Sequence, residues 1–112
     1  MTNILANLVV VELASVLAGP LAGSFLAEHG ARVIKIENVK SGGDATRQWK
    51  LATENTEGNV SAYYASANFG KEIRMLDMSD SKGYAIFLDT IRNADIVISN
   101  FQQKTARKLG VD

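Results

Sequence analysis

The chain has 112 residues, with twelve basic and twelve acidic side chains, no cysteine and a single histidine. This length suits one domain, and the balanced charge disfavours duplex nucleic acid as a partner, because such binders usually carry a basic excess. The absence of cysteine excludes disulfides, thiolate catalysis and Cys-type metal sites, and one histidine does not make a zinc site, so we expect no bound metal.

The amino terminus, MTNILANLVVVEL, lacks the basic leader and the small-residue cleavage site of a signal peptide. The longest apolar stretch, residues 13–21, is interrupted by Ser15, Gly19 and Pro20. It is far shorter than the roughly 20 residues that cross a bilayer. We therefore expect a cytoplasmic protein with no membrane contact.

In the first third of the chain, a β-branched run at residues 8–13 predicts a buried strand. Residues 15–20 read as a loop, and apolar and small residues at helical spacing predict a helix over residues 21–29, which Gly30 ends. Residues 31–37 alternate as a second strand does. Strand, helix and strand within about thirty residues predict a βαβ unit with parallel strands.

Residues 38–62 are glycine-rich and polar with little periodicity, which predicts a long functional excursion. Beyond it, residues 71–78 read as a strand, a helix capped by Ser79 or Asp80 runs to about residue 93, and residues 94–99 form another strand. A short basic helix over residues 103–109 ends at Gly110. About four strands and three helices alternate, so we predict an α/β fold with a Rossmann-like parallel sheet and flanking helices. Only two residues follow the last helix, so we expect the sheet to be truncated.

The turn after the first strand has two interpretations that the sequence leaves open. In one it is structural, with Gly19 in an unusual backbone conformation and Pro20 beginning the helix. In the other it contacts a ligand at the carboxyl end of the strand. The G-x-x-x-G spacing from Gly19 to Gly23 lacks the dinucleotide fingerprint, which disfavours NAD. Glu37 is then a strand-end residue that faces water or a neighbouring lysine.

Aromatic and basic side chains outside this turn are also open to two readings. Trp49, Tyr63 and Tyr64 either cover the edge of the core or wall a substrate cleft. Arg47 is either solvated or pairs with an anionic ligand. The cations of the last helix, which include Lys108, either complement its dipole or meet the phosphates of a nucleotide.

Three blocks of sequence together resemble one family. VVELASVLAGPLAGSFLAEHGARVIKIE, GGDATRQW and ADIVISNF…KLGVD are similar, in order and spacing, to the opening of class III CoA-transferases of the formyl-CoA transferase type. The resemblance implies that residues 1–112 are an amino-terminal CoA-binding domain fragment. It implies reversible transfer of CoA between an acyl-CoA and a small carboxylate, through covalent catalysis by an aspartate, in interlocked dimers.

The same resemblance assigns roles to individual residues. Positions matching the family's CoA contacts are Val16, Leu17, Leu76, Asn100, Phe101, Thr105, Lys108 and Leu109. Trp49 and Tyr63 match positions near the acyl or carboxylate substrate.

The chain also departs from the family pattern. Asn38, Ser79 and Gln102 stand where the family commonly has basic residues. Each lost charge-assisted contact is worth about 1.5–3 kcal/mol, although Lys40 or Lys104 offers a replacement charge. The family's catalytic aspartate lies beyond residue 112, and Asp77, Asp80, Asp89 and Asp95 do not match it. We therefore expect the 112 residues alone to be inactive.

Two alternatives remain at this stage. One is a fragment of the related acyl-CoA racemase branch, which exchanges an α-proton on the same fold; the transferase-like block GGDATRQW favours transfer over it. The other is a non-catalytic binding or assembly module that keeps the fold. In either case a parallel sheet without its last strands exposes an apolar edge, so we expect homo-oligomers.

Overall fold

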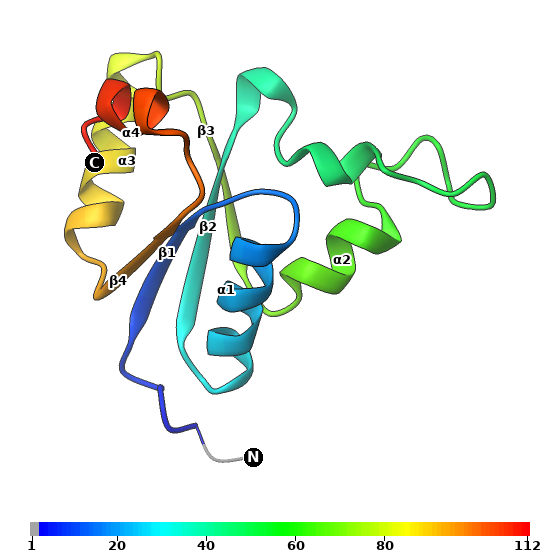
Figure 1. The fold of residues 1–112 in the computed structure, drawn as a ribbon, viewed down its shortest axis with the longest axis horizontal. Coiled ribbons are helices and arrows are strands. Elements are labelled where there is room, and N and C mark those ends of the chain that lie inside the picture. The colour runs from blue at the N-terminus through cyan, green and yellow to red at the C-terminus, as the bar shows by residue number, and fades with distance from the viewer. Residues whose placement is uncertain (1–2) are drawn as a thin grey trace.

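The computed structural model describes residues 3–112 and contains one four-stranded sheet in which all strands are parallel (Figure 1). The strands are β1 (Val9–Leu13), β2 (Arg32–Asn38), β3 (Glu72–Leu76) and β4 (Ile96–Ser99). Their order across the sheet is β3-β2-β1-β4, so the two most buried strands, β1 and β2, lie in the middle. The predicted α/β fold with a parallel sheet is confirmed.

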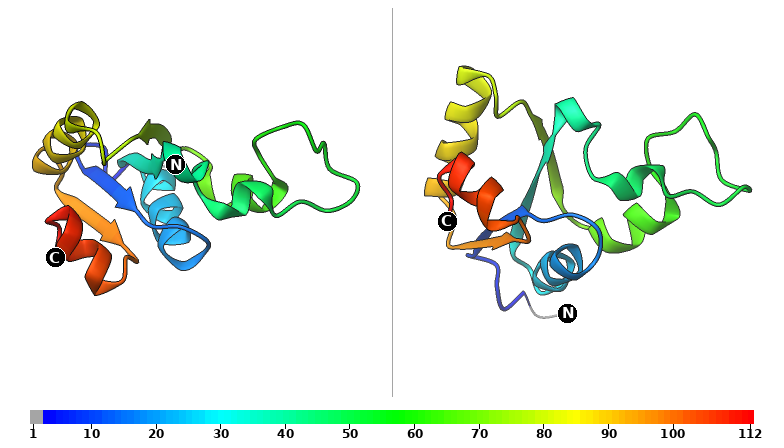
Figure 2. Two further views of the ribbon diagram at one scale, coloured as in Figure 1. Left: turned by 90° about the horizontal axis from the view of Figure 1, so that it is seen from above. Right: turned by 45° about the horizontal axis from the view of Figure 1, so that its top comes forward.

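Helices join the strands and cover both faces of the sheet. They are α1 (Ala18–Glu28), α2 (Ala62–Asn68), α3 (Ser81–Arg92) and α4 (Gln103–Leu109). Two short 3-10 turns, η1 (Val39–Ser41) and η2 (Ala45–Gln48), follow β2. Seen from above, α3 and α1 lie on opposite sides of the strands, and α2 lies beside α1 (Figure 2).

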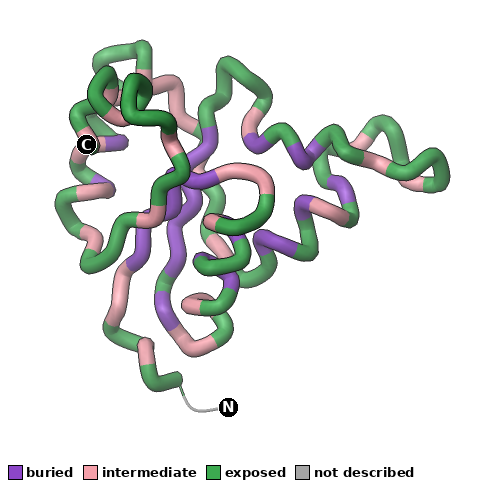
Figure 3. The backbone as a smooth tube through the Cα atoms, in the orientation of Figure 1, coloured by how far each residue is buried: buried purple, intermediate pink, exposed green. Residues whose placement is uncertain are grey.

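The face covered by α3 and α4 is apolar. Val11 of β1 and Ile34 and Ile36 of β2 pack against Phe87, which is fully buried in α3. Alternate residues of the same strands point to the opposite face, where Val10 and Val33 meet α1. The central position of β1 and β2 explains why the longest buried runs of the backbone follow these two strands (Figure 3).

Several helix ends lie where the sequence predicted them. The Asp80 side chain accepts a hydrogen bond from the Gly83 amide and caps α3. Gly30 follows the end of α1 with φ of 102°, and Gly110 ends α4 with φ of 73°. Both are left-handed conformations that favour glycine.

Two local predictions were wrong. α1 begins at Ala18, three residues earlier than predicted, because Pro20 lies in its first turn, where no amide hydrogen is required. Gly19 has no unusual backbone angle; it is a glycine because a Cβ there would overlap the side chain of Ala14. The positive φ belongs to Val16.

The excursion after β2 is partly structured. It contains η1 and η2 and leads into α2, a helix that the sequence analysis did not predict. The segment between η2 and α2 projects away from the sheet (Figures 1 and 2). Ser61 begins α2 by accepting a hydrogen bond from the Tyr64 amide at 2.9 Å. Within residues 3–112, none of the helices has both the length and the apolar character of a membrane span.

Candidate functional site

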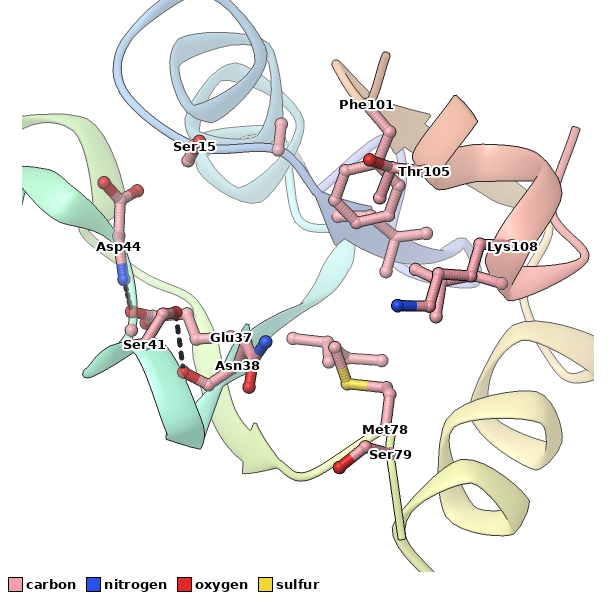
Figure 4. A pocket seen from close by; sticks show the side chains of 15 residues that line it. Ser15, Glu37, Asn38, Ser41, Asp44, Met78, Ser79, Phe101, Thr105 and Lys108 are labelled. Carbon is pink, nitrogen blue, oxygen red and sulfur yellow. Dashed lines mark hydrogen bonds between the residues drawn. The ribbon is translucent and has the colours of Figure 1, made fainter. Parts of the chain in front are cut away.

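A cleft of about 390 Å³ lies at the carboxyl ends of the strands. Its walls come from the end of β1, the end of β2, the segment after β3 and helix α4 (Figure 4). Leu13, Ile36 and Met78 supply apolar surface. This is the edge at which open parallel sheets bind ligands.

One wall of the cleft is formed by four predicted CoA contacts, Phe101, Thr105, Lys108 and Leu109. Phe101 and Leu109 pack against the apolar cluster on the α3 face. The Tyr84 hydroxyl donates to the Leu109 carbonyl at 2.9 Å and ties α4 to α3. Among the described lining residues Lys108 is the one cation, and its ammonium group points into the opening (Figure 4).

The opposite wall contains two of the positions at which the chain departs from the family pattern, Asn38 and Ser79. The Asn38 side chain accepts a hydrogen bond from the Lys40 amide at 2.9 Å, and the Ser79 hydroxyl donates to Asp77 at 2.5 Å. Lys40 lies outside the lining, with its ammonium 3.7 Å from Asp77. This wall is therefore polar but carries no cation.

The remaining predicted site residues do not line the cleft. Leu76 is half-buried at the end of β3 and packs against the apolar cluster. Trp49 and Tyr63 pack edge to face, with ring centroids 5.2 Å apart, in the excursion and α2. They thus form a separate aromatic pair, and Trp49 is about half exposed, at 49%.

Val16 and Leu17 lie in the turn between β1 and α1, and Asn100 follows β4 and contacts this turn. Val16 has φ of 72°, and it is the one non-glycine residue with a positive φ in residues 3–112. Leu17 is the N-cap residue that precedes α1, and it is exposed. The Asn100 side chain accepts from the Ser15 amide at 3.2 Å and donates to the Ser15 carbonyl at 2.8 Å. Asn100 therefore connects the end of β4 to this turn.

In the lining of the cleft, Glu37 forms a buried ionic contact whose partner the sequence analysis predicted wrongly. Its carboxylate accepts two hydrogen bonds from Arg47, each 2.8 Å long, and a third at 2.6 Å from the Tyr64 hydroxyl. Glu37 and Arg47 are both buried, so Glu37 faces neither water nor lysine, and Arg47 is not solvated. The excursion folds back onto β2 through this pair.

The hydrogen bonds around Glu37 set its protonation. Burial alone would raise the pKa of Glu37, but the bonds from Arg47, Tyr64 and the Asp44 amide outweigh it and lower the pKa. Burial and the bond to Glu37 both raise the pKa of Tyr64. Glu37 is therefore a carboxylate, and Tyr64 a neutral phenol, at neutral pH.

A second set of buried charges surrounds Lys35. Its ammonium group lies 3.0 Å from Glu12 and 2.8 Å from Asp44, and it donates to the Ala14 carbonyl at 3.0 Å. Lys71 approaches Glu12 from the other side, at 2.6 Å. Burial lowers the pKa of Lys71 even though Glu12 opposes this effect. Gly23 of α1 lacks a Cβ because one would overlap the Glu12 carboxylate.

Sequence reasoning missed Glu12, Lys35 and Asp44, although a signal was present for the first two. Glu12 and Lys35 each interrupt a β-branched run that was itself predicted to be buried. A charge inside such a run must be paired when it is buried. Asp44 has no comparable mark, because it lies nine residues from Lys35 in an excursion without periodicity.

The aspartates excluded as catalytic residues include two with structural roles. Asp80 caps α3, and Asp95 accepts a hydrogen bond from the Val9 amide at 2.8 Å beside the start of β4. In the part of the chain that the structure describes, no three His, Asp or Glu side chains form a group that could hold a metal ion.

Comparison with known proteins identifies the family to which this architecture belongs. Residues 5–112 match the model of CoA-transferase family III, and the chain is a member of that family. A succinate–glutarate CoA-transferase of Agrobacterium fabrum is 42% identical over 111 residues, which cover 96% of this chain and 28% of that protein. An acetyl-CoA:oxalate CoA-transferase of Acetobacter aceti is 38% identical over 104 residues, covering 93% of this chain and 25% of that protein.

Solved structures agree with this assignment. A CAIB/BAIF family protein from Brucella suis superimposes with a TM-score of 0.85 and 35% sequence identity, over 100% of this chain and 29% of that one. The chain thus spans between a quarter and three-tenths of the length of these relatives.

Proposed function

We propose that this chain forms the CoA-binding part of an enzyme that transfers CoA between an acyl-CoA thioester and a free carboxylic acid. The observation that carries the proposal is the cleft at the strand ends, where Phe101, Thr105, Lys108 and Leu109 form one wall. Membership of CoA-transferase family III supports the reaction class. The nucleophilic aspartate of such an enzyme would be supplied from outside these 112 residues.

The side chains of the cleft suit the base and the phosphates of an acyl-CoA thioester. Phe101 and the apolar side chains of Leu13 and Met78 give a surface for a planar base, and Lys108 gives a charged donor for phosphate. The wall with Asn38 and Ser79 has only neutral donors, and the carboxylates of Glu37 and Asp44 also line this side of the cleft. Each missing cation there weakens binding by roughly ten- to a hundredfold, so Lys108 carries the main electrostatic contact.

A calorimetric titration of the chain with CoA tests the proposal, with NAD as the control ligand. We expect saturable binding of CoA and none of NAD. Lys108→Ala should weaken CoA binding about tenfold or more, because it removes a charge-assisted hydrogen bond. The sequence offered Lys104 as a replacement charge, but Lys104 lies outside the cleft lining. Lys104→Ala is therefore the matched control, since it removes an equal charge from the same helix.

Three results would contradict the proposal. Binding of NAD alone would refute a CoA site. Equal losses for the two lysine variants would show a non-specific charge effect. Absence of binding to either ligand would favour the assembly module.

We also propose that the chain associates with a second copy of itself. Within residues 3–112, β4 pairs only with β1, and Ile96 and Val97 on this edge strand are 37% and 42% exposed. Sedimentation equilibrium should show a dimer or larger species that dissociates on dilution. Val97→Lys should shift it to monomer by placing a charge on the edge, and a monomer at all concentrations would refute this proposal.

A further inference from the structure

The β1–α1 turn is held by side chains from distant parts of the chain. Lys35 donates to the Ala14 carbonyl at 3.0 Å, and Asn100 binds both the amide and the carbonyl of Ser15. The Val16 amide is 3.4 Å from Oδ1 of Asp44. Four consecutive backbone groups, from the Ala14 carbonyl to the Val16 amide, are thus bound by side chains and not by secondary structure.

The conformation held in this way is one that its sequence disfavours. Val16 has φ of 72°, a region in which a β-branched residue is a strong outlier, and such strain persists only where the surroundings determine it. Ala14 and Ser15, immediately before it, line the cleft. The strained residue therefore adjoins the wall against which a ligand would lie.

Asp44 is placed to connect this turn with the buried charges. Its Oδ2 binds Lys35 at 2.8 Å, while its Oδ1 accepts from the amide and hydroxyl of Thr46, at 3.0 and 2.8 Å, and faces the Val16 amide. Burial opposes ionisation of Asp44, but Lys35 and Thr46 lower its pKa below the ordinary value. The residue is therefore a carboxylate with two acceptor oxygens, both of them used.

We propose that Asp44 and Asn100 are positioning residues, which hold the β1–α1 turn in the strained conformation that shapes the cleft. Lys35 contributes to the same support through its hydrogen bond to the Ala14 carbonyl. The identity of the ligand in the cleft depends on the proposed function, but the role of these residues in holding the turn does not. Asn100 thereby has a role apart from direct ligand contact, because the oxygen and the nitrogen of its side-chain amide are both hydrogen-bonded to Ser15.

Asp44→Asn is the sharpest test, because an amide has one acceptor oxygen where a carboxylate has two. If that oxygen faces Lys35, an NH₂ group faces the Val16 and Thr46 amides, and the turn loses its support. Thr46→Val is the matched control. It removes one hydrogen bond to the same Asp44 oxygen and keeps the side-chain shape, but it leaves the contact with Val16 intact.

The readout is the nuclear Overhauser effect between the amide and α hydrogens of Val16 in the full, isotope-labelled chain. This signal is strong at positive φ because the two hydrogens lie close together. We expect it to be strong in the wild type and in Thr46→Val, and clearly weaker in Asp44→Asn. An unchanged signal in a folded Asp44→Asn variant, or an equal loss in Thr46→Val, would overturn the proposal.

Asn100→Ala keeps the proposal testable if Asp44→Asn does not fold, since Asn100 is exposed. Removing its amide should speed hydrogen exchange at the Ser15 amide by several-fold to about tenfold. Ser99→Ala is the control, because it removes a neighbouring hydrogen bond to the Phe101 amide and does not touch the turn. Equal exchange at Ser15 in wild type and Asn100→Ala would refute its positioning role.

CoA affinity separates this proposal from the proposed function. If the wild type binds CoA, Asp44→Asn should weaken binding about tenfold and Thr46→Val by less than threefold, which are effects of a positioned wall. If the wild type does not bind CoA, the proposed function fails, while the Val16 signal and the Ser15 exchange still decide whether these residues position the turn.

Discussion

On one face of the sheet, Val11 and Ile34 pack against Phe87; on the other, Glu12 and Lys35 occupy the next positions of the same two strands. Toward their carboxyl ends, the two strands therefore alternate between apolar and ionic burial, whereas Val10 and Val33 keep the start of the α1 face apolar. Apolar burial is non-directional and tolerates changes of shape that conserve volume. Buried ion pairs depend on direction and are costly to break. The comparison indicates that the α3 face supplies stability, and that the α1 face supplies exact geometry beside the cleft.

Removing one partner from the ionic face should have the largest effect. Lys35→Met keeps an unbranched chain of similar length but leaves Asp44 and one oxygen of Glu12 without a charged partner. We expect a loss of about 3–5 kcal/mol in the free energy of unfolding, measured by urea denaturation. Lys82→Met on the exposed side of α3 should change it by less than about 0.5 kcal/mol. A loss below about 1 kcal/mol for Lys35→Met would remove the distinction between the faces.

Acidification should weaken the ionic face and leave the apolar packing of the α3 face unchanged. The pKa values of Glu37 and Asp44 are lowered on folding, so the folded chain binds these protons less readily than the unfolded chain. Their contribution is complete above the ordinary carboxyl pKa of about 4, and it is lost as the pH falls through the lower folded values. Unfolding free energies measured from pH 7 to pH 2 should show this fall.

The matched variant for the acid experiment is Glu37→Gln. It should be less stable than wild type at pH 7, because Arg47 loses its charged partner. It should also lose less further stability on acidification, since one of the two carboxylates is gone. A slope as steep as that of the wild type would place the acid sensitivity elsewhere.

The smallest effect is expected on the apolar face. Ile34→Leu conserves volume in a cluster without directional contacts, so it should cost less than about 1.5 kcal/mol. The same urea titration measures it, and Ile34→Asn serves as the contrasting variant, since it buries an unpaired amide. If Ile34→Leu lowers the free energy of unfolding as much as Lys35→Met does, the apolar face depends on side-chain geometry as strongly as the ionic face.

Strands were predictable because continuous runs of β-branched residues indicate buried strands. The runs around Val10, Ile34 and Ile98 are β-branched, and each forms a strand in the sheet. Helix α2 was missed because its seven residues, with two adjacent tyrosines, show no clear apolar periodicity. The segment 15–20 was predicted as a loop, but Pro20 lies in the first turn of α1, where a helix tolerates proline.

The site was predictable only in part. Phe101, Thr105, Lys108 and Leu109 were expected at the ligand edge and do line one cleft, because they follow directly from β4 into α4. The pairing of Lys35 with Asp44 was not foreseeable, because it depends on how the excursion folds back over β2. Charge pairing across such a segment leaves no periodic mark in a single sequence.

The position of β1 between β2 and β4 also bears on the order of folding. Among the strands of residues 3–112, β1 is synthesised before the other three, but β4, one of its two neighbours, is synthesised after them. Asn100 and Ser15 are separated by 85 residues, and contacts of such long range form late and slowly. On the ribosome, the βαβ unit can form as soon as β2 has emerged, whereas the β1–α1 turn is complete only after Asn100 has been synthesised. The turn therefore reaches its final conformation only after β4 has paired with β1 and Asn100 can bind Ser15.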